Sequence, residues 1–471
     1  MTDHTRTPPG TGESPRLGMW DAMSIIVGIV VGTAIYKSVG FIYYNVSSGW
    51  MALGAFALGG LLSFIGALCY AELATTYPRM GGDYVYLSRA FGRPVGFLFG
   101  WAQLAVILTG SIAAMGYAFG DYSVRLWGLE ESSKVWLTGG VVVLLSLLNL
   151  AGVIFGKWVQ NVLTIAKILG LLAIVVVGLG WGGADISFQP SVVPDKTNFG
   201  LAMVLVLYTF GGWSDAAFVA SEVKDRSRNI PKALFYGIGA ITLVYLLVNV
   251  GYLWGVGFDK MRGAPTPAAD VLSDAFGENG AKVMSLLVML SALGALNGLI
   301  FTGSRIFTAL GREHTLFAAL GRWDPRLNVP IWSILAQTAV ASLLILTVGT
   351  TAGNEAFDWC LTTVGFDPFP WKDPRFGSEF DTLVSCTAPV FWTFFLLTGI
   401  SLFVLRMKDP DLERPFRAPF YPLVPLIFCA TSCYMLYSSQ TFVKELSLLG
   451  WIPLAVGLPL YFISRRTNGT A

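Results

Sequence analysis

The sequence predicts an all-helical integral membrane protein with twelve transmembrane helices. Of its 471 residues, 54% are hydrophobic and 13% are charged, whereas a soluble domain carries about 25% charged residues. The hydrophobic residues form blocks long enough to cross a bilayer, which takes about 20 mostly apolar residues. These blocks lack the period-two alternation of barrel strands. Because backbone polar groups in hydrocarbon must be paired within a segment, each block is expected to be a helix.

Twelve apolar segments follow one another along the chain. They are preceded by residues 1–18, which are polar, rich in Pro, Gly and Thr, and without the apolar core of a signal peptide. We expect this segment to be a disordered cytoplasmic tail, with a second short cytoplasmic tail at 464–471. The candidate helices lie near 19–39, 50–71, 94–118, 136–152, 160–181, 199–221, 233–256, 282–309, 330–349, 384–405, 420–438 and 446–463.

The distribution of basic residues indicates the orientation. If the N-terminal tail is cytoplasmic, most of the 31 Lys and Arg residues fall in the tails and loops on that same side. Cytoplasmic loops carry an excess of these residues, so both termini are predicted to face the cytoplasm. The long aromatic connection at 350–383 then faces outward, either as a simple cap or as an outer lid or partner surface.

Composition excludes several classes of function. A net charge of +2 gives no indication of nucleic-acid binding. The chain has only two histidines, one in the N-terminal tail and one in a loop, and its five cysteines show no metal-ligand spacing. We therefore expect no metal, no cofactor and no enzymatic activity, and we interpret the helical pair Cys429 and Cys433 as packing residues.

Two of the predicted helices are interrupted by glycines. The first contains Gly28 and Gly32, and the sixth contains Gly211 and Gly212. Each weakens a helix interior by about 1 kcal/mol relative to alanine. These helices are the first of two successive five-helix blocks, 19–181 and 199–405, which are followed by two further helices at 420–463. Matched interruptions in two halves indicate an inverted-repeat transporter with a site at the midplane. Free amides there can hold a carboxylate, and free carbonyls can hold an ammonium.

Two ionisable residues lie deep in apolar segments. Because a charge there is costly, such residues are candidates for a functional role. Lys167 is either a structural tether or a cation fixed where a sodium ion would otherwise bind, one that loses its proton during the cycle. Asp215 either caps the second half of the sixth helix together with Ser214 or meets a substrate amine or a proton. Glu72 and Lys37 lie near the ends of their segments and are expected at the membrane interface, where long side chains snorkel.

Several long motifs in order resemble the amino acid–polyamine–organocation superfamily, and within it the L-type amino acid transporter branch with its bacterial relatives. The resemblance runs from about Met19 to Leu436. Its motifs are GTAIY, YAELATTYPRMGGDYVYLSRAFG, FGGW followed by EVKDRSRNIPKA, ALGALNGLIFTGSR, and RMKDPDLERPFRAPFYPLVP.

The resemblance implies a five-plus-five inverted repeat with two added helices, the LeuT-like fold, and alternating access. It places the substrate carboxylate on amides of the first helix and the ammonium on carbonyls of the sixth. It assigns an aromatic gate to Tyr208, a side-chain contact to Ser214, and a pocket aromatic to Trp392. Lys167 matches a lysine that replaces the sodium ion in sodium-independent members. The candidate substrate-binding residues are Val30, Gly32, Thr33, Ala34, Tyr208, Thr209, Gly211, Ser214, Asp215 and Trp392.

The sequence departs from the family pattern at a few positions. Ala34 replaces the second glycine of the first-helix motif, Arg226 stands where the family has a proline, and Asp215 replaces a residue that is often neutral. The loop after the third helix has no cysteine. The disulfide that links animal relatives to a heavy-chain partner is therefore not expected.

The leading hypothesis is a sodium-independent transporter of L-amino acids in a plasma membrane, working as an exchanger or with protons. Its partners are then a small-molecule amino acid and the lipid bilayer, with no nucleic acid. The alternative is a carrier of cationic amino acids or polyamines, with Asp215 as the extra counter-charge. A nutrient sensor or a channel is a third class, for which the sequence has neither an appended signalling domain nor a ring of filter residues.

Overall fold

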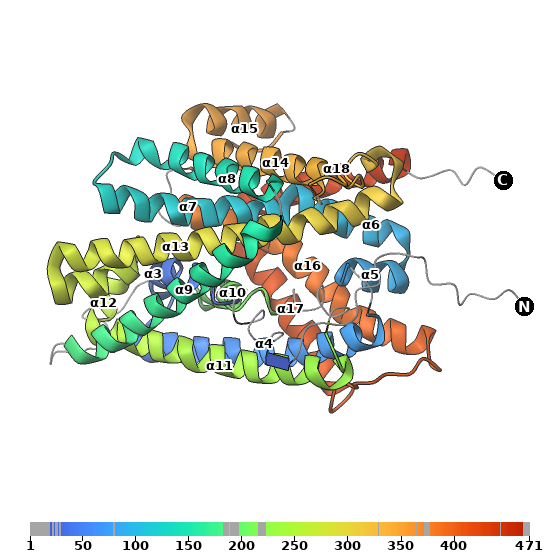
Figure 1. Cartoon of the computed structure of the whole chain (residues 1–471), viewed down its shortest axis with the longest axis horizontal. Coiled ribbons are helices and arrows are strands. Elements are labelled where there is room, and N and C mark those ends of the chain that lie inside the picture. Colours follow the sequence, from blue (N-terminus) through green and yellow to red (C-terminus); the bar gives the residue numbers. More distant parts are fainter. Residues whose placement is uncertain are drawn as a thin grey trace, which may run out of the picture.

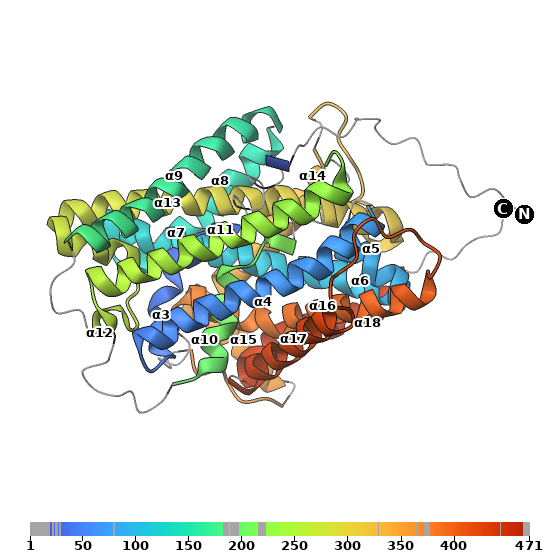
Figure 2. The same cartoon turned by 90° about the horizontal axis from the view of Figure 1, so that it is seen from below.

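The computed structural model describes residues 19–20, 23, 27, 30–78, 81–151, 153–181, 188, 197–214, 223–327, 329–363, 365–371, 377–442 and 444–464. In these parts of the chain the structure is helical, and the one β pairing is an isolated bridge between Asp324 and Val329. Most of the long helices run side by side along the longest axis of the molecule (Figure 1). The view from below shows α4 (Gly49–Thr76) and α11 (Arg226–Gly255) on one face of this bundle (Figure 2).

Eight helical segments in the described parts of the chain are long and apolar enough to cross a membrane, so the chain is a multi-pass membrane protein. The twelve-helix count stays a prediction. The eight are α4; the continuous run of α6 (Arg93–Ala102), η1 (Gln103–Ile107) and α7 (Leu108–Trp127); η2 (Glu131–Ser133) with α8 (Lys134–Leu150); α11; α13 (Pro267–Glu313); α14 (Ile331–Gly349); α16 (Glu379–Lys408); and most of α18 (Lys444–Ser464).

The remaining helices lie outside these eight segments. Two of them, α9 and α10, contribute apolar stretches at Lys167–Trp181 and Phe199–Thr209. This group comprises α2 (Ala34–Lys37), α3 (Val39–Tyr44), α5 (Asp83–Phe91), α9 (Val153–Trp181), α10 (Phe199–Thr209), α12 (Phe258–Met261), η5 (Thr315–Phe317), α15 (Thr351–Thr363) and α17 (Leu423–Phe442).

Local sequence explains where several helices begin and end. Ser48 caps the start of α4, because its hydroxyl accepts a hydrogen bond from the backbone N–H of Met51 at 3.2 Å. The helix ends before the pair Tyr77–Pro78, because a residue that precedes proline is disfavoured in the helical region. Gly128 ends α7 in the left-handed conformation, with φ of 62°.

Helices α9 and α11 pack backbone to backbone through glycines. A methyl group added at Gly178 of α9 would lie 2.7 Å from the carbonyl carbon of Gly251 in α11, and nearer still to its oxygen. In return, a methyl group at Gly251 would lie 2.9 Å from the carbonyl oxygen of Ile174. Small residues at such crossings let membrane helices approach closely. This contact fixes α9, which carries Lys167, against the rest of the bundle.

The side chains of Glu72 and Lys37 do not snorkel toward solvent as expected. Both side chains are buried, with 2% and 3% of their surface exposed. Glu72 accepts two hydrogen bonds from the guanidinium of Arg406, at 2.8 and 2.6 Å, and one from the backbone N–H of Ala418. Lys37 forms an ion pair with Asp121 at 2.7 Å. Ion pairs with distant helices compensate the cost of burying these charges.

The connection at 350–383, which is predicted to face outward, contains a helix, α15, rather than a simple loop. The chain folds back after it, because Asp358 of α15 accepts hydrogen bonds from the backbone N–H of Phe369 at 2.9 Å and the indole N–H of Trp371 at 3.1 Å. Trp359 on the same helix is 69% exposed. The choice between a cap and a lid stays open.

Candidate functional site

The first interruption separates Val30 from α2. The backbone leaves helical geometry at Val31 and Gly32 and becomes helical again at Ala34. The N–H of Gly32 bonds to the carbonyl of Val30 at 2.6 Å, a contact too local for an α-helix. A helix that restarts here presents its first amides without intrahelical partners. The chain is thus interrupted at Gly32, as predicted, and the amides at the start of α2 lack intrahelical partners.

The second interruption follows α10. The helix ends at Thr209, and the N–H of Gly211 bonds back to the carbonyl of Tyr208 at 2.9 Å. Gly212 then takes a φ of 100°, which favours glycine because other residues are strained there. Helix α10 therefore ends at the predicted glycines, while Asp215 and the second half of this helix lie outside the described residues and stay a prediction.

A tyrosine of α11 joins the two interruptions. The hydroxyl of Tyr245 lies 3.0 Å from the carbonyl oxygen of Val30 and 3.0 Å from that of Thr209. The side chain is fully buried. Tyr245 was not among the predicted site residues, because a tyrosine in an apolar segment carries no local signal that it reaches two other helices.

A cavity of about 200 Å³ lies between the two interruptions and the neighbouring helices. The predicted site residues that line it are Val30, Gly32, Ala34, Lys167, Tyr208, Thr209, Gly211, Ser214 and Trp392. Thr33 is between two lining residues and fully buried, and its hydroxyl has no hydrogen-bond partner in the described structure. The cavity thus brings together segments that the sequence predicts to meet.

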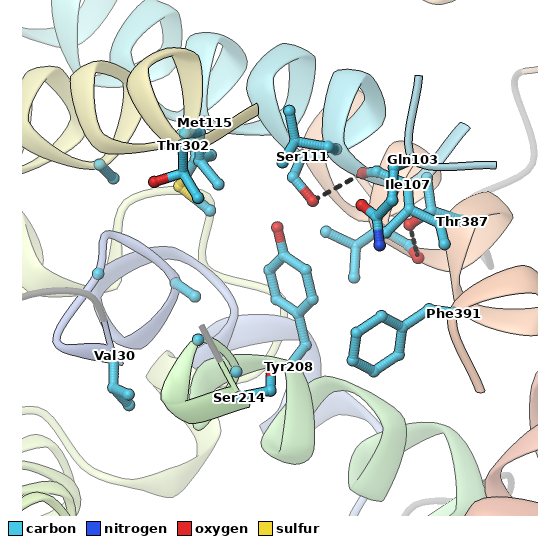
Figure 3. Close-up of a pocket in the computed structure, with 18 of the residues that line it drawn as sticks. Val30, Gln103, Ile107, Ser111, Met115, Tyr208, Ser214, Thr302, Thr387 and Phe391 are labelled. Atoms are coloured by element: carbon cyan, nitrogen blue, oxygen red, sulfur yellow. Dashed lines mark hydrogen bonds between the residues drawn. The ribbon is translucent and has the colours of Figure 1, made fainter. Parts of the chain in front are cut away.

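The interior of the cavity is partly polar. Tyr208 projects into it from α10, with its hydroxyl directed at Ser111 of α7 (Figure 3). The Ser111 hydroxyl donates to the carbonyl of Ile107 at 2.9 Å, and that of Thr387 donates to the carbonyl of Val384 at 3.0 Å. Further lining residues that the sequence analysis did not single out are Asp83, Gln103, Met115, Thr302 and Phe391.

A π-helical turn lies where the third predicted helix passes the cavity. The turn spans Gln103–Ile107, and the hydroxyl of Thr109 donates to the carbonyl of Leu104, five residues back, at 2.9 Å. Such turns are rare and often occur at functional sites. Gln103 lines the cavity from this turn. A glutamine in an apolar segment was the signal in the sequence that could have identified it.

Lys167 lies at the wall of the cavity and is 1% exposed. The hydroxyl of Tyr36, which follows the first interruption, donates to the backbone carbonyl of Lys167. The lysine is therefore held beside the first broken helix, as both of its predicted roles require. This contact involves the backbone, so it does not choose between a tether and a fixed cation.

Charged residues from four helices meet around Lys37. Besides its ion pair with Asp121 of α7, the Lys37 ammonium donates to the carbonyl of Pro265 at 2.8 Å. Lys134 of α8 lies 3.4 Å from Asp121 and 2.8 Å from Glu379 of α16. We refer to Lys37, Asp121, Lys134 and Glu379 as the Lys37 network. It ties α2 to helices that also line the cavity.

The chain belongs to the amino acid permease family, whose model matches residues 17–456. Members of this family are membrane transporters rather than enzymes.

Among known proteins the chain is similar to the serine/threonine exchanger SteT of Bacillus subtilis (strain 168), with 28% identity over 98% of this chain and 99% of the relative. It is also 28% identical to the human large neutral amino acids transporter small subunit 2, over 96% of this chain and 81% of that protein. The human b(0,+)-type amino acid transporter 1 is 27% identical over 92% of this chain and 84% of that protein.

Proposed function

We propose that the chain is a sodium-independent secondary transporter of L-amino acids, which works by alternating access in a plasma membrane. The observation that carries this proposal is the cavity between two interruptions, with backbone amides at the start of α2 on one side and backbone carbonyls at the end of α10 on the other. An amino acid zwitterion uses both sets of groups. The similarity to an exchanger and to a large neutral amino acid transporter supports the same substrate class.

In this proposal the substrate carboxylate binds the amides of Thr33 and Ala34 at the start of α2, and that of Gly32 when it leaves the carbonyl of Val30. The ammonium binds carbonyls at Tyr208, Thr209 and Gly211, and the side chain points toward Ser214, Trp392 and the hydroxyl of Tyr208. The full fold is then a twelve-helix inverted repeat, with halves at 19–181 and 199–405, added helices at 420–463, and both termini in the cytoplasm.

Lys167 supplies the basis for sodium independence. A fixed ammonium beside the first broken helix occupies the place where a sodium ion would be coordinated, so no sodium ion is needed to hold the helix. Transport then proceeds by exchange or with protons.

The test is uptake of labelled amino acids into proteoliposomes that contain the purified protein. Uptake should be unchanged when choline replaces sodium outside, and internal substrate or a pH gradient should stimulate it. Strict sodium dependence would contradict the assignment of Lys167. Competition by arginine or putrescine, lost in Asp215→Asn, would favour the cationic alternative instead. A disulfide-linked complex on non-reducing gels would contradict the prediction that no heavy chain is attached.

A further inference from the structure

Asp83 is a buried carboxyl group in the lining of the cavity, and none of the proposed substrate contacts uses it. It is the first residue of α5, which connects α4 to α6 outside the eight apolar spans. Gly81 and Gly82 precede it with φ values of 118° and 47°, a conformation that favours glycine and turns the chain into α5. The side chain lines the cavity and is 6% exposed.

The contacts of Asp83 are with hydroxyl groups. Thr398 of α16 donates a hydrogen bond to the carboxyl at 3.2 Å. The hydroxyl of Tyr70 on α4 is buried near it without a hydrogen-bond partner in the described structure. Tyr86, one turn further along α5, is buried beside these groups, and its hydroxyl has no hydrogen-bond partner in the described structure.

No lysine or arginine in the described parts of the chain forms an ion pair with Asp83. The charged and titratable groups on the surrounding helices have other partners. Arg89 pairs with Asp409, Arg406 with Glu72, Lys408 with the carbonyl of Ala90, and Tyr84 with Glu313, while Arg93 lies near Tyr84 and His314.

A buried carboxylate without a cation is costly, and it is neutralised by binding a proton. Burial raises the pKa of Asp83 to about 7, and the nearby hydroxyl groups of Tyr70 and Thr398 offset this only in part. The group therefore changes its protonation near neutral pH, whereas an exposed aspartate does so near pH 4.

We propose that Asp83 is a proton-binding site and that one proton binds to and leaves its carboxylate in each transport cycle. The proposal rests on the proposed function and, of exchange and proton coupling, selects proton coupling. With the proton bound, the cavity holds a neutral carboxyl group that donates one hydrogen bond. Without it, the cavity lining holds a buried negative charge with no cation beside it, which hinders the closing of the helices around it.

The experiment compares wild-type protein with Asp83→Asn in proteoliposomes, from about pH 5.5 to about pH 8.5, a range centred on the raised pKa. Wild-type uptake should fall as pH rises through about 7, approaching a tenfold loss per pH unit above it as the protonated fraction falls. Added substrate should also move protons, measured with a pH-sensitive dye inside the vesicles. Asp83→Asn should still bind substrate in a thermal-shift assay, but its uptake should be independent of pH and move no protons.

Two further variants distinguish an effect of Asp83 protonation from a purely structural effect of a substitution. Thr398→Val removes a hydrogen bond that lowers the pKa of Asp83, so the midpoint of the pH profile should move upward. Asp411→Asn removes an exposed carboxyl in the segment after α16 and should leave the profile unchanged. Infrared difference spectra give a readout without transport, since wild type should lose a protonated-carboxyl band near pH 7 that Asp83→Asn lacks.

Identical pH profiles and identical infrared spectra for wild type and Asp83→Asn would overturn the proton site while leaving amino acid transport intact. Uptake lowered equally at every pH in Asp83→Asn would overturn it as well, in favour of a contact with the substrate ammonium. Absence of amino acid transport by wild type at every pH would instead overturn the proposed function, and the infrared titration would still report on the proton site.

Discussion

The glycine contact between α9 and α11 gives a sharp prediction for Gly178→Ala. Gly178 and Gly180 lie two residues apart in the same helix, but only Gly178 faces another backbone. A methyl group at Gly178 would lie 2.7 Å from the carbonyl carbon of Gly251, whereas a methyl group at Gly180 meets nothing within 4 Å. Gly180→Ala is therefore a matched control for the effect of alanine on the helix itself.

The magnitude follows from these distances. Carbon atoms in good contact lie about 3.5–4.0 Å apart, so Gly178→Ala must push the two helices apart by roughly 1 Å. Overpacking of this kind costs about 1–3 kcal/mol. Alanine favours a helix over glycine by about 1 kcal/mol at either position. Gly180→Ala should thus be neutral or stabilising, and Gly178→Ala should be less stable than this control by about 1–3 kcal/mol.

Unfolding by sodium dodecyl sulfate in mixed micelles, followed by tryptophan fluorescence, measures this difference. The expected gap corresponds to roughly a 5- to 150-fold change in the unfolding equilibrium. Gly251→Ala should behave like Gly178→Ala, since its methyl group would meet the carbonyl oxygen of Ile174 at 2.9 Å. If Gly178→Ala unfolds at the same or a higher detergent fraction than Gly180→Ala, the backbone contact does not exist as described.

Three further predictions concern the buried polar groups. Glu72→Gln leaves the Arg406 guanidinium without its carboxylate, and loss of one partner from a buried pair costs about 3–5 kcal/mol. Because Arg406 is 20% exposed, we expect a loss of unfolding free energy near the lower end of this range. The same detergent unfolding measures it. Gln103→Leu removes an amide from the cavity and should lower uptake of glutamine relative to leucine by up to about tenfold, since a neutral hydrogen bond contributes about 0.5–1.5 kcal/mol; an unchanged ratio in competition assays would show that Gln103 does not contact the substrate. Lys37→Met removes the ion pair with Asp121. Because a charged hydrogen bond contributes about 1.5–3 kcal/mol, amide hydrogen exchange in α2 should accelerate roughly 10- to 100-fold. Unchanged exchange would refute a role of the Lys37 network in holding α2.

The features that could be predicted from the sequence are those with a local signal. Gly32 and Gly211 stand out because glycine is costly inside a helix, and Lys167 stands out because an ammonium is costly in an apolar segment. Each of them lies at the cavity. Their meeting could be inferred because matched breaks in two halves face one another in an inverted repeat.

The features that were missed depend on partners far away in the sequence. Glu72 lies near the end of an apolar segment, which by itself predicts an interfacial side chain. Its partner Arg406 lies 334 residues away in the sequence. Tyr245 and Asp83 gave no local signal, since a tyrosine or an aspartate near a helix end is ordinary. Their roles arise only when other helices place carbonyls, hydroxyls or a cavity beside them.

The Tyr245 hydroxyl also limits how the two interrupted helices can behave. A phenol has one proton, and two carbonyls compete for it at equal distances of 3.0 Å. When the proton is directed at Val30, the carbonyl of Thr209 has lone pairs available for an ammonium, and the reverse holds when it is directed at Thr209. When an ammonium binds one of these carbonyls, the Tyr245 O–H turns toward the other. Binding at one interrupted helix therefore changes the hydrogen bonding of the other interrupted helix through the rotation of a single O–H bond.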